Sequence, residues 1–522
     1  MAKQALISVS DKSGLEPLLD YLSLAKYEIV STGGTAAYIR EKGFQVKEVS
    51  ELTKFPEMLG GRVKTLHPKV LGGVLARRGL KEDIKDLADH EIETIDLVVV
   101  NLYPFADVIS RENLVFADAI ENIDIGGPTL IRSAAKNYQS VTVLSDPSDY
   151  GAFINLSQEF GPDSSELIEF RSRQAIKAFA QVSSYDKLIA KFLESRIISQ
   201  EEKQEVPKEI NLNLELKQKT RYGENPHQKA GLYVDADKAP EGLAAAQQMQ
   251  GKELSFNNYL DLDAAWNIVS EYETNIPCCV IVKHNNPCGV AIAPNVAQSF
   301  IEALSCDTVS AFGGIVAFNS TVDVATANEI TQMFLEAVIA PDFTDEALEI
   351  LATKSKLRVL KMPSKPDLKD EEFEIKTING GYLMQSKNNF LMDSEQLKTV
   401  TKTEADESLW VDLIFAWKIV KHVKSNAIVV ASAGKAVGVG CGQTNRVKAV
   451  KDALENIDMD SRGAVLASDG FFPFADNVDL CALNNIAAII QPGGSIRDNE
   501  VIEAADKAGI AMLTTGTRHF KH

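Results

Sequence analysis

Lys283 and His284 are adjacent at the end of an apolar run and are the pair of side chains best suited to catalysis in this sequence. The run 278–282 contains only small and β-branched residues, which predicts a buried strand, and the Asn-Asn-Pro-Cys-Gly sequence at 285–289 predicts a turn after it. An ammonium disfavours a second positive charge beside it, so we expect a neutral imidazole that can accept a proton. A base and a cation at one point indicate a catalytic site. A solvated strand end is the alternative.

Three further segments combine glycine with charged or hydroxyl side chains. Residues 60–68 (GGRVKTLHP) place two cations, a hydroxyl and a histidine in one loop. Asp124 precedes a predicted helix that carries Arg132 and Lys136 four residues apart, and hence on one face. Residues 32–35 (TGGT) predict a glycine turn before a helix, where free N–H groups attract phosphate. Each segment also has a purely structural explanation, namely a basic solvated loop, an acid at a helix start and an ordinary turn. Together they favour an anionic ligand.

The elements that would position these segments alternate between strand and helix over residues 1–199. The predicted strands are 5–9, 27–31 and 95–100, and the predicted helices are 15–24, 36–41 and 165–195. The last strand is apolar throughout, as expected of a parallel strand covered on both faces. This alternation predicts a doubly wound domain that binds its ligand at the carboxyl edge of the sheet.

The remainder of the chain contains an internal repeat. Residues 314–341 and 464–492 share the order strand, helix, strand, and a strand pair joined by a tight turn precedes each of them, at 280–292 and 427–439. The sequence therefore predicts a duplicated α/β domain, with chance similarity as the alternative.

Polar stretches divide these regions. Residues 199–219 are rich in Glu, Lys and Gln and predict a linker, and the charged, proline-containing segment 355–374 predicts a separation between the repeats. Between linker and repeat, residues 221–228 (RYGENPHQ) gather polar and turn-forming side chains more densely than an ordinary surface loop does.

Size and composition limit the functions that this chain can have. With 522 residues it is too long for one core, and about three domains are expected. A net charge of −19 argues against a surface that coats nucleic acid or an anionic membrane. No run approaches the roughly 18 apolar residues of a membrane-spanning helix, and the chain leads directly into a predicted strand rather than a signal sequence. Six cysteines without a CxxC pattern fit reduced thiols, so we expect a cytoplasmic protein.

A series of short strings, in order over nearly the whole chain, resembles one enzyme family. The strings are SVSDKSG, STGGTA, GGRVKTLHP, NLYPF, DIGGPTLIRSAAKN, RYGENPHQ, VKHNNPCG, SAFGG, GQTNRV, SDGFFPF, QPGGSIRD and TGTRHFKH. They are similar to those of bifunctional purine-biosynthesis proteins that act as AICAR formyltransferase and IMP cyclohydrolase. The resemblance implies an α/β fold with an N-terminal methylglyoxal-synthase-like doubly wound domain (1–199) and two tandem cytidine-deaminase-like domains (200–370 and 371–522). It also implies a homodimer with formyltransferase sites at the subunit interface.

The resemblance assigns the last two steps of IMP synthesis. The 5-amino group of AICAR takes a formyl group from the co-substrate 10-formyltetrahydrofolate, and formyl-AICAR then closes to IMP with loss of water. His284 matches the family's base and Lys283 the cation that stabilises the oxyanion, two groups that formyl transfer requires. The matching AICAR-binding positions are Arg221, Tyr222, Gly313, Glu336, Asn426, Arg446, Phe471 and Arg518. The matching folate-binding positions are Val447, Asp476, Ser495 and Ile496.

Ring closure is assigned to the N-terminal domain. Lys136 matches the family's proton-transfer residue, with Lys64 and Tyr103 as its expected neighbours. The matching positions for IMP and formyl-AICAR are Ser10, Asp11, Lys12, Thr32, Gly33, Gly34, Thr35, Arg62, Val63, Lys64, Thr65, Asn101, Tyr103, Asp124 and Ile125. The formyl group already lies beside the carboxamide, so positioning accounts for much of this reaction.

The chain departs from the family pattern at Leu71, where a second His is frequent, at Asn445, where Ser is frequent, and at Cys441, where Ala is frequent. None of these changes removes a residue assigned to proton transfer.

Three other functions compete with this interpretation. A deaminase-like fold raises zinc nucleobase deamination, but neither Pro277-Cys278-Cys279 nor Pro287-Cys288-Gly289 continues to the required second Cys, so we expect no catalytic metal. The chain could instead be a formyltransferase alone, with the N-terminal domain as a nucleotide-sensing module. Nucleic-acid binding through the basic loops fits poorly with the charge of −19.

Overall fold

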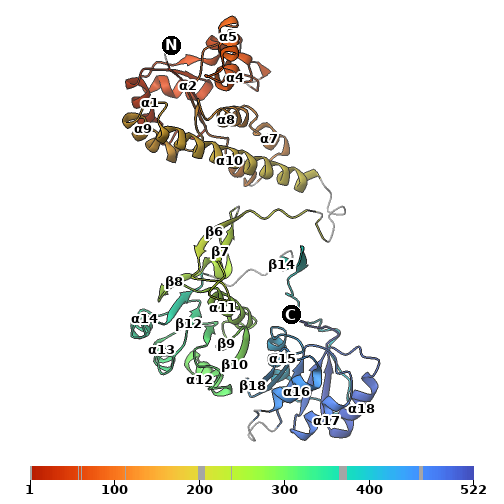
Figure 1. The fold of residues 1–522 in the computed structure, drawn as a ribbon. Coiled ribbons are helices and arrows are strands. Elements are labelled where there is room, and N and C mark those ends of the chain that lie inside the picture. Colours follow the sequence, from red (N-terminus) through yellow and green to blue (C-terminus); the bar gives the residue numbers. More distant parts are fainter. Residues whose placement is uncertain are drawn as a thin grey trace. The chain divides into compact units, whose positions relative to one another are not determined.

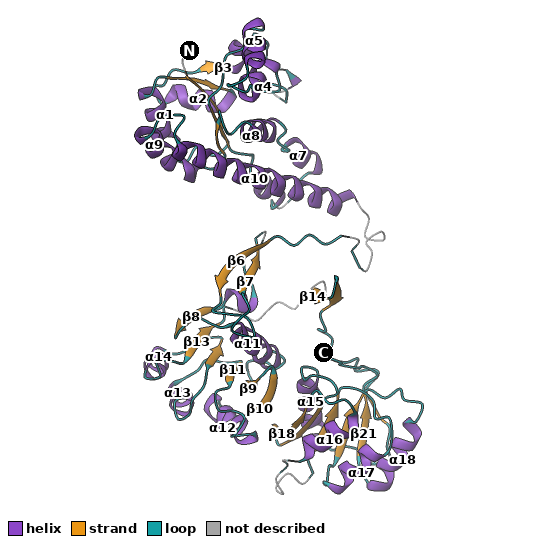
Figure 2. Cartoon of the chain, in the orientation of Figure 1, coloured by secondary structure: helices purple, strands orange, loops and turns teal. Residues whose placement is uncertain are grey.

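The chain forms two compact units, Met1–Ile210 and Asn211–His522, shown with their elements in Figures 1 and 2. The structure, a computed structural model, describes residues 3–522 apart from 57, 60–61, 112, 198–205, 208, 237, 364–372, 456 and 458–462. The expected domain boundaries at 199/200 and 370/371 both lie outside the described residues, so the division into three domains stays a prediction.

Unit 1 is built on a parallel sheet of five strands in the order β3-β2-β1-β4-β5. The strands are β1 (Lys3–Ser8), β2 (Tyr27–Ser31), β3 (Lys47–Glu48), β4 (Leu97–Val100) and β5 (Thr142–Leu144). The helices are α1 (Leu15–Leu24), α2 (Gly33–Glu41), α3 (Val49–Thr53), α4 (Pro68–Leu75), α5 (Lys81–Asp89), α6 (Phe105–Ile109), α7 (Phe116–Glu121), α8 (Gly126–Lys136), α9 (Tyr150–Glu159) and α10 (Ser165–Ile197).

Helices cover both faces of this sheet, because alternate residues of each apolar strand point to opposite sides. One face packs against α4, α8 and the middle of α10, and the other against α1, α2, α9 and the start of α10. The predicted doubly wound architecture is confirmed. One detail was wrong: helix α2 begins at Gly33 rather than at Ala36, so the Thr-Gly-Gly-Thr segment is the first turn of the helix rather than a turn before it.

Unit 2 contains one sheet of twelve strands, in the order β16-β21-β20-β19-β17-β18-β10-β9-β11-β12-β13-β8. Its strands are β8 (Gln247–Gln250), β9 (Cys278–Lys283), β10 (Asn286–Ile292), β11 (Ile315–Phe318), β12 (Ala337–Ala340), β13 (Arg358–Lys361), β16 (Lys398–Thr399), β17 (Ile428–Ser432), β18 (Lys435–Gly440), β19 (Val465–Ser468), β20 (Ala488–Gln491) and β21 (Ala511–Thr514). Two separate hairpins are β6 (Leu214–Lys219) with β7 (Gly231–Asp235) and β14 (Phe373–Ile378) with β15 (Gly381–Ser386). The helices are α11 (Phe256–Val269), α12 (Val296–Cys306), α13 (Val324–Ile330), α14 (Asp345–Ala352), α15 (Glu407–Val420), α16 (Arg446–Leu454), α17 (Asp476–Leu483) and α18 (Asp498–Ala508).

The twelve-stranded sheet consists of two halves with the same topology. In each half a hairpin (β9–β10 or β17–β18) pairs antiparallel with a strand that begins a parallel set of three (β11–β12–β13 or β19–β20–β21). A glycine on the second hairpin strand lets a helix approach closely in both halves: a Cβ at Gly289 would lie 2.1 Å from the carbonyl oxygen of Ala303, and one at Gly440 2.0 Å from that of Ala449. The predicted duplication is confirmed.

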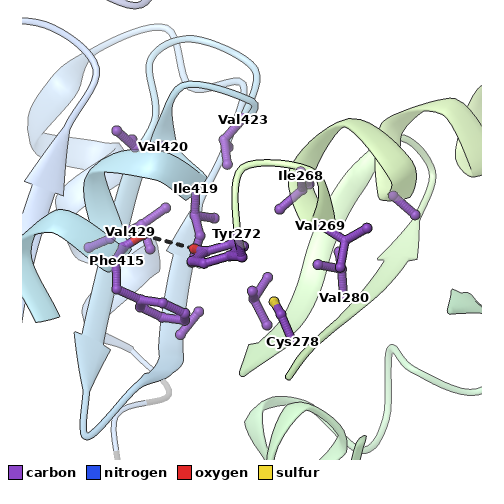
Figure 3. Packing of buried hydrophobic residues seen from close by; sticks show 14 of the residues in the cluster. Ile268, Val269, Tyr272, Cys278, Val280, Phe415, Ile419, Val420, Val423 and Val429 are labelled. Atoms are coloured by element: carbon purple, nitrogen blue, oxygen red, sulfur yellow. Dashed lines mark hydrogen bonds between the residues drawn. The ribbon is translucent and has the colours of Figure 1, made fainter. Parts of the chain in front are cut away.

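The two halves share a core. They join where β10 pairs with β18, and on one face of the joined sheet α11 and α15 pack together with alternate residues of the strands. Figure 3 shows Tyr272 inserted between the halves, where its hydroxyl donates to the carbonyl oxygen of Phe415 at 3.2 Å. The other face has two separate cores, one under α12, α13 and α14 and one under α16, α17 and α18.

Three expectations for unit 2 need correction. The predicted linker 199–219 contains β6, and the predicted separating segment 355–374 contains β13 and the first residues of β14. The turn after β9 is formed by His284 and Asn285, both at positive φ, rather than by residues 285–289, most of which belong to β10. Two residues at positive φ form the type of tight turn that matches the twist of a hairpin.

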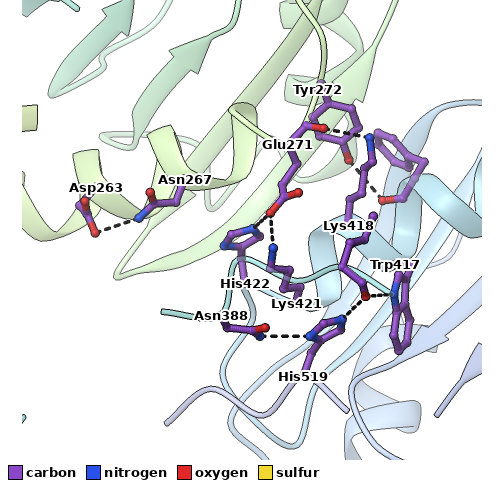
Figure 4. A network of polar contacts seen from close by, with 12 residues as sticks. Asp263, Asn267, Glu271, Tyr272, Asn388, Trp417, Lys418, Lys421, His422 and His519 are labelled. Carbon is purple, nitrogen blue, oxygen red and sulfur yellow. Dashed lines mark hydrogen bonds and ion pairs between the residues drawn. The ribbon is translucent and has the colours of Figure 1, made fainter. Parts of the chain in front are cut away.

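A buried ionic network also joins the two halves, as Figure 4 shows. The Glu271 carboxylate accepts from the Lys421 ammonium at 2.7 Å and lies 2.8 Å from Nε2 of His422. Burial would raise the pKa of Glu271, but the hydrogen bonds and charges of His422 and Lys421 lower it to about 2. Burial also lowers the pKa of His422, by more than its bond to Glu271 raises it. The ion pair at neutral pH is therefore Glu271 with Lys421, and a neutral His422 donates to the same carboxylate.

We expect Glu271→Gln to destabilise unit 2 by about 3 kcal/mol at pH 8, because the variant leaves the Lys421 ammonium buried without a counter-charge. The lowered pKa of Glu271 provides stability that is present above pH 4.5 and is lost as the pH falls from 4.5 toward 2. The lowered pKa of His422 adds stability that is lost as the pH falls below 6.5. Because His422 titrates in both proteins, the gap in unfolding free energy between wild type and variant should narrow only as the pH falls from 4.5 toward 2, where Glu271 takes up a proton.

Tryptophan fluorescence during urea unfolding measures this, since all three tryptophans (Trp266, Trp410 and Trp417) lie in unit 2. Glu273→Gln, an exposed neighbour in the same loop, is the matched control. Equal unfolding midpoints for the Glu271 variant and the control would contradict the assigned ion pair.

Candidate functional sites

The predicted nucleotide-binding residues of unit 1 meet at the carboxyl edge of its sheet. Asn101, directly after β4, accepts through Oδ1 from the Ser10 N–H at 2.6 Å and donates through Nδ2 to the Asp11 carbonyl at 2.7 Å. The Thr35 hydroxyl accepts from the Val9 N–H at 3.1 Å and so ties the first turn of α2 to the end of β1. Side-chain bonds thus hold the segments after β1, β2 and β4 together.

Asp124, Gly127, Lys64 and Thr65 lie together at this edge and form the Asp124 cluster. Oδ1 of Asp124 accepts from the Gly127 N–H at 2.8 Å, which places the carboxylate over the start of α8. Burial raises the pKa of Asp124, by more than the N–H groups of Gly127 and Tyr103 and the charge of Lys64 lower it. A half-buried carboxyl group with a raised pKa and a nearby ammonium is a candidate for proton transfer.

Close glycine contacts complete the cluster. A Cβ at Gly33 would lie 3.5 Å from the Lys64 ammonium, and one at Gly126 would lie 2.8 Å from the Thr65 hydroxyl. A pocket of about 290 Å³ adjoins this cluster, and the predicted residues Thr32, Gly33, Val63 and Lys64 form part of its wall. The structure therefore brings the segments 32–35, 62–65 and 124–127 together, as the sequence suggested.

Other predicted residues of this set lie at the rim or apart. Arg62 is exposed and forms an ion pair with Glu121, and Val63, Tyr103 and Ile125 are exposed as well. Lys12 lies 5.9 Å from the ring of Tyr38. Gly34 has open space around it.

Lys136 does not join the cluster. It is the last residue of α8 and is exposed, about 15 Å along the helix axis from Gly126. Helix α8 runs back toward the amino edge of the sheet, where β5 begins. The separation along α8 argues against the expectation that Lys136 has Lys64 and Tyr103 as neighbours, and the structure does not test its assigned role.

In the first half of unit 2, the β9–β10 hairpin carries the Lys-His pair. The Lys283 ammonium donates to the carbonyl oxygens of Phe312 (2.8 Å) and Gly313 (3.1 Å), so the cation lies at a predicted AICAR position. His284 is exposed at the tip of the hairpin. The Asn285 N–H donates to Oδ1 of Asp261 on α11 at 2.6 Å, which fixes the turn. Burial raises the pKa of Asp261, against the charges of His284 and Lys283.

The remaining predicted residues of this half lie on loops and strand ends. Glu336 precedes β12 and pairs with Arg358 at 2.7 Å, while Gly313 donates to the Phe334 carbonyl at 2.8 Å. Arg221 is exposed and its guanidinium lies over the Tyr222 ring at 5.7 Å.

In the second half, Arg446 bonds to Asp469, Asn426 and Ser468, and these four residues form the Arg446 cluster. The buried Arg446 forms an ion pair with Asp469 and donates to Asn426 Oδ1 at 2.8 Å and to the Ser468 hydroxyl at 2.9 Å. Much of its guanidinium is thus engaged within the protein. The exposed Phe471 and Arg518 lie near this cluster, because their sequence neighbours are in contact with each other and with it. Phe520 packs against Gly470, and the His519 N–H donates to the Asp469 carbonyl.

The predicted folate positions lie on neighbouring elements of this half. Val447 is in the first turn of α16, Asp476 is the first residue of α17, and Ser495 and Ile496 precede α18. Ile496 is fully exposed, and the Ser495 N–H donates to Asp498 at 3.1 Å.

The departures from the family pattern have local explanations. Asn445 caps α16, because its side chain accepts from the Lys448 N–H at 2.9 Å, and Ser is an equally good capping residue. Leu71 and Cys441 are partly buried against the cores of their units.

Sequence reasoning missed several residues of these sites. Asp469 stands in the quoted string SDGFFPF but had no role assigned, and Asp261, Glu121 and Tyr185 lie on helices without any local signal. Only the polar pair Ser468-Asp469 after an apolar run could have indicated one of them.

Among the described residues, no group of three or more His, Cys, Asp or Glu side chains could hold a metal ion. Burial raises the pKa of the Cys288 thiol to about 12. No helix in the described part of the chain is long and apolar enough to cross a bilayer.

A doubly wound domain with a pocket of about 290 Å³ at the carboxyl edge of its sheet, followed by a duplicated α/β unit with a lysine and a histidine at a hairpin, is typical of an enzyme that binds its ligands at strand ends. Comparison with known proteins identifies the family. The model of the AICARFT/IMPCHase bienzyme family matches residues 134–456, and that of the MGS-like domain matches residues 14–129. The chain belongs to the AICARFT/IMPCHase bienzyme family.

Curated relatives match over the full length of the chain. The bifunctional purine biosynthesis protein PurH of Thermoanaerobacter sp. (strain X514) is 49% identical over 522 residues, covering 100% of both chains. The proteins of the same name from Halalkalibacterium halodurans and Aquifex aeolicus are 48% and 49% identical, each over 522 residues and all of the relative's length. Among solved structures, the crystal structure of ForH is 36% identical with a TM-score of 0.33, covering 36% of this chain and 98% of that one.

Proposed function

We propose that the chain carries out the two reactions named by its family, formyl transfer from 10-formyltetrahydrofolate to AICAR in unit 2 and closure of formyl-AICAR to IMP in unit 1. The bienzyme description covers both activities, which argues against a formyltransferase with a purely sensory N-terminal domain. The observation that supports the assignment to two sites is that each unit has its own cluster of ionisable side chains at strand ends.

For formyl transfer, the hairpin supplies the two required groups. His284 at the exposed tip would take the proton of the AICAR amine and return it to N10 of the folate as the C–N10 bond breaks. The Lys283 ammonium would stabilise the oxyanion that forms on the formyl oxygen when the amine attacks. Two carbonyl oxygens hold that ammonium in place at Gly313, so it needs no reorganisation during the reaction.

The phosphate of AICAR would be bound by exposed guanidinium groups. Arg221 and Arg518 are both exposed and can fork onto two phosphate oxygens. Arg446 would contribute chiefly by fixing Asn426, to which it donates at 2.8 Å. The folate would lie against Val447, Asp476, Ser495 and Ile496.

The exposure of these groups supports a homodimer. His284, Arg221, Phe471 and Arg518 are all exposed in the single chain, whereas formyl transfer needs a site closed to water. A second copy that covers the hairpin of one chain with the Arg446 cluster of another would complete the site.

The six cysteines are free thiols, which fits a cytoplasmic location.

For ring closure, the Asp124 cluster provides both proton-transfer groups. The carboxamide nitrogen attacks the formyl carbon, and its proton passes to the former formyl oxygen, which becomes a hydroxyl group. That hydroxyl leaves as water together with the proton of the formamide nitrogen, and a C=N bond forms in the new ring. Asp124, with its raised pKa, would accept the nitrogen proton, and Lys64 would stabilise the oxygen. The resemblance assigns this proton transfer to Lys136 instead, which is the last residue of α8. Variants of Lys64 and of Lys136 can therefore distinguish the two assignments.

Replacing His284 by Ala should lower formyltransferase kcat by about 10²–10⁴-fold, because the general base is lost while the AICAR-binding groups stay. Lys283→Met should lower it by about 10²–10³-fold through loss of oxyanion stabilisation. Steady-state assays of formyl transfer measure both effects. Ring closure of added formyl-AICAR by the same variants is the internal control. The exposed His90→Ala and Lys238→Met are matched controls. Near-normal turnover of either hairpin variant would refute its role.

Exchange of Lys64 for Met should lower ring-closing turnover by about 10²-fold or more, because the charge beside Asp124 is lost. Lys136→Met should stay within about threefold of wild type, as a change of an exposed side chain remote from the cluster. Both variants are assayed with formyl-AICAR, with formyl transfer as the control for folding. The reverse order of effects would return proton transfer to Lys136.

A further inference from the structure

Tyr185 on α10 lies directly beneath the Asp124 cluster. Its hydroxyl oxygen accepts a hydrogen bond from the Asp124 N–H at 2.8 Å, across 61 positions of sequence. Tyr185 is buried, and its ring packs edge-on against Phe105 of α6 with ring centroids 6.2 Å apart. The hydroxyl is therefore held in place by an apolar cluster that also includes Ala119 and Phe192.

Two hydrogen bonds fix Asp124, one to its main chain and one to its side chain. Tyr185 fixes its main chain, and the Gly127 N–H fixes its side chain at 2.8 Å. The space around the carboxylate is tight, since a Cβ at Gly127 would lie 2.3 Å from Asp124 Oδ2. The residues just before Asp124 follow the end of α7, where the Ile123 N–H donates to Ile120. The hydrogen bond to Tyr185 thus fixes the main chain between α7 and α8, and with it the position of the Asp124 carboxylate.

We infer that Tyr185 is a positioning residue for ring closure: it holds the Asp124 carboxylate in register with Lys64 from the long helix α10. The inference rests on the proposed role of Asp124. An error of about 1 Å in the place of a catalytic group can cost on the order of 10²-fold in rate. One hydrogen bond to the main chain is therefore enough to affect turnover without touching the substrate.

Tyr185→Phe removes the acceptor and keeps the ring in its apolar cluster. We expect ring-closing kcat to fall by about tenfold or more while KM for formyl-AICAR changes by less than about twofold, since binding groups elsewhere are unchanged. Formyl transfer by the same chain should be unaffected. We also expect faster hydrogen exchange at the Asp124 amide with unchanged exchange in β1 and β4, a local effect that a general loss of stability would not produce.

Tyr150→Phe is the matched control, because the Tyr150 hydroxyl is also buried in unit 1 and has no hydrogen-bond partner among the described residues. It should keep wild-type turnover in both reactions. Ring-closing kcat of Tyr185→Phe within twofold of wild type overturns the inference, and so does an equal loss in Tyr150→Phe.

Asp124→Asn separates this inference from the function on which it rests. If that variant loses ring closure and Tyr185→Phe keeps it, only the positioning role fails. If Asp124→Asn closes the ring at the wild-type rate, the proposed site itself is wrong, and the positioning inference is overturned with it.

Discussion

A strand that is covered on both faces can present polar side chains only where it ends, and this constraint arranges the functional residues of both units. In unit 1 the strands β1, β2 and β4 are almost entirely buried, and Ser10, Thr32 and Asn101 are among the first polar residues after them. In unit 2 the buried strand β9 ends in Lys283, and β19 is followed directly by Asp469. Burial of the strand interiors thus concentrates charge and hydroxyl groups at one edge of each sheet.

At those edges, helix starts and glycine contacts decide how closely the segments approach. The carboxylate of Asp124 lies over the first N–H groups of α8, where the helix dipole favours a negative charge, while burial pushes its pKa in the opposite direction. Glycine at 33, 126 and 127 lets Lys64, Thr65 and Asp124 come within contact distance of the backbone. The same residue type serves packing in unit 2, where Gly289 and Gly440 admit helices α12 and α16 against the hairpins.

The sequence predicted what local patterns determine. Apolar runs located β2 and β9, helical spacing located α1 with the observed bounds, and the repeated order of strands and helices indicated the duplication. Strand β6 was taken for a linker because Leu214–Lys219 is polar and largely exposed, so it carries no pattern of burial. The turn at His284 and Asn285 was misplaced by one or two residues, since positive φ is uncommon for histidine and Pro287 was a stronger turn signal.

Contacts between distant segments could not be predicted from one sequence. Nothing local connects Asp124 with Tyr185, Arg446 with Asp469, or Glu271 with Lys421, although each pair is buried or half-buried and bonded. The position of Lys136 shows the same limit for motifs. The string DIGGPTLIRSAAKN unites Asp124 and Lys136 in sequence, but a helix of 11 residues carries the lysine away from the edge where the aspartate lies.

The two candidate sites differ in how completely one chain builds them, and the chemistry gives a reason. Ring closure joins two groups of one molecule, so a cluster such as Asp124 with Lys64, beside a pocket of about 290 Å³, can be contained in a single unit. Formyl transfer must bring a nucleotide and a folate together, and two large ligands need more binding surface than one hairpin provides. The Lys283–His284 pair of the first half and the Arg446 cluster of the second half share one sheet, yet His284 and Arg518 are both exposed. If both halves contribute to formyl transfer, as proposed, groups this open to solvent need a further surface to exclude water, and a second copy of the chain is the proposed source of that surface.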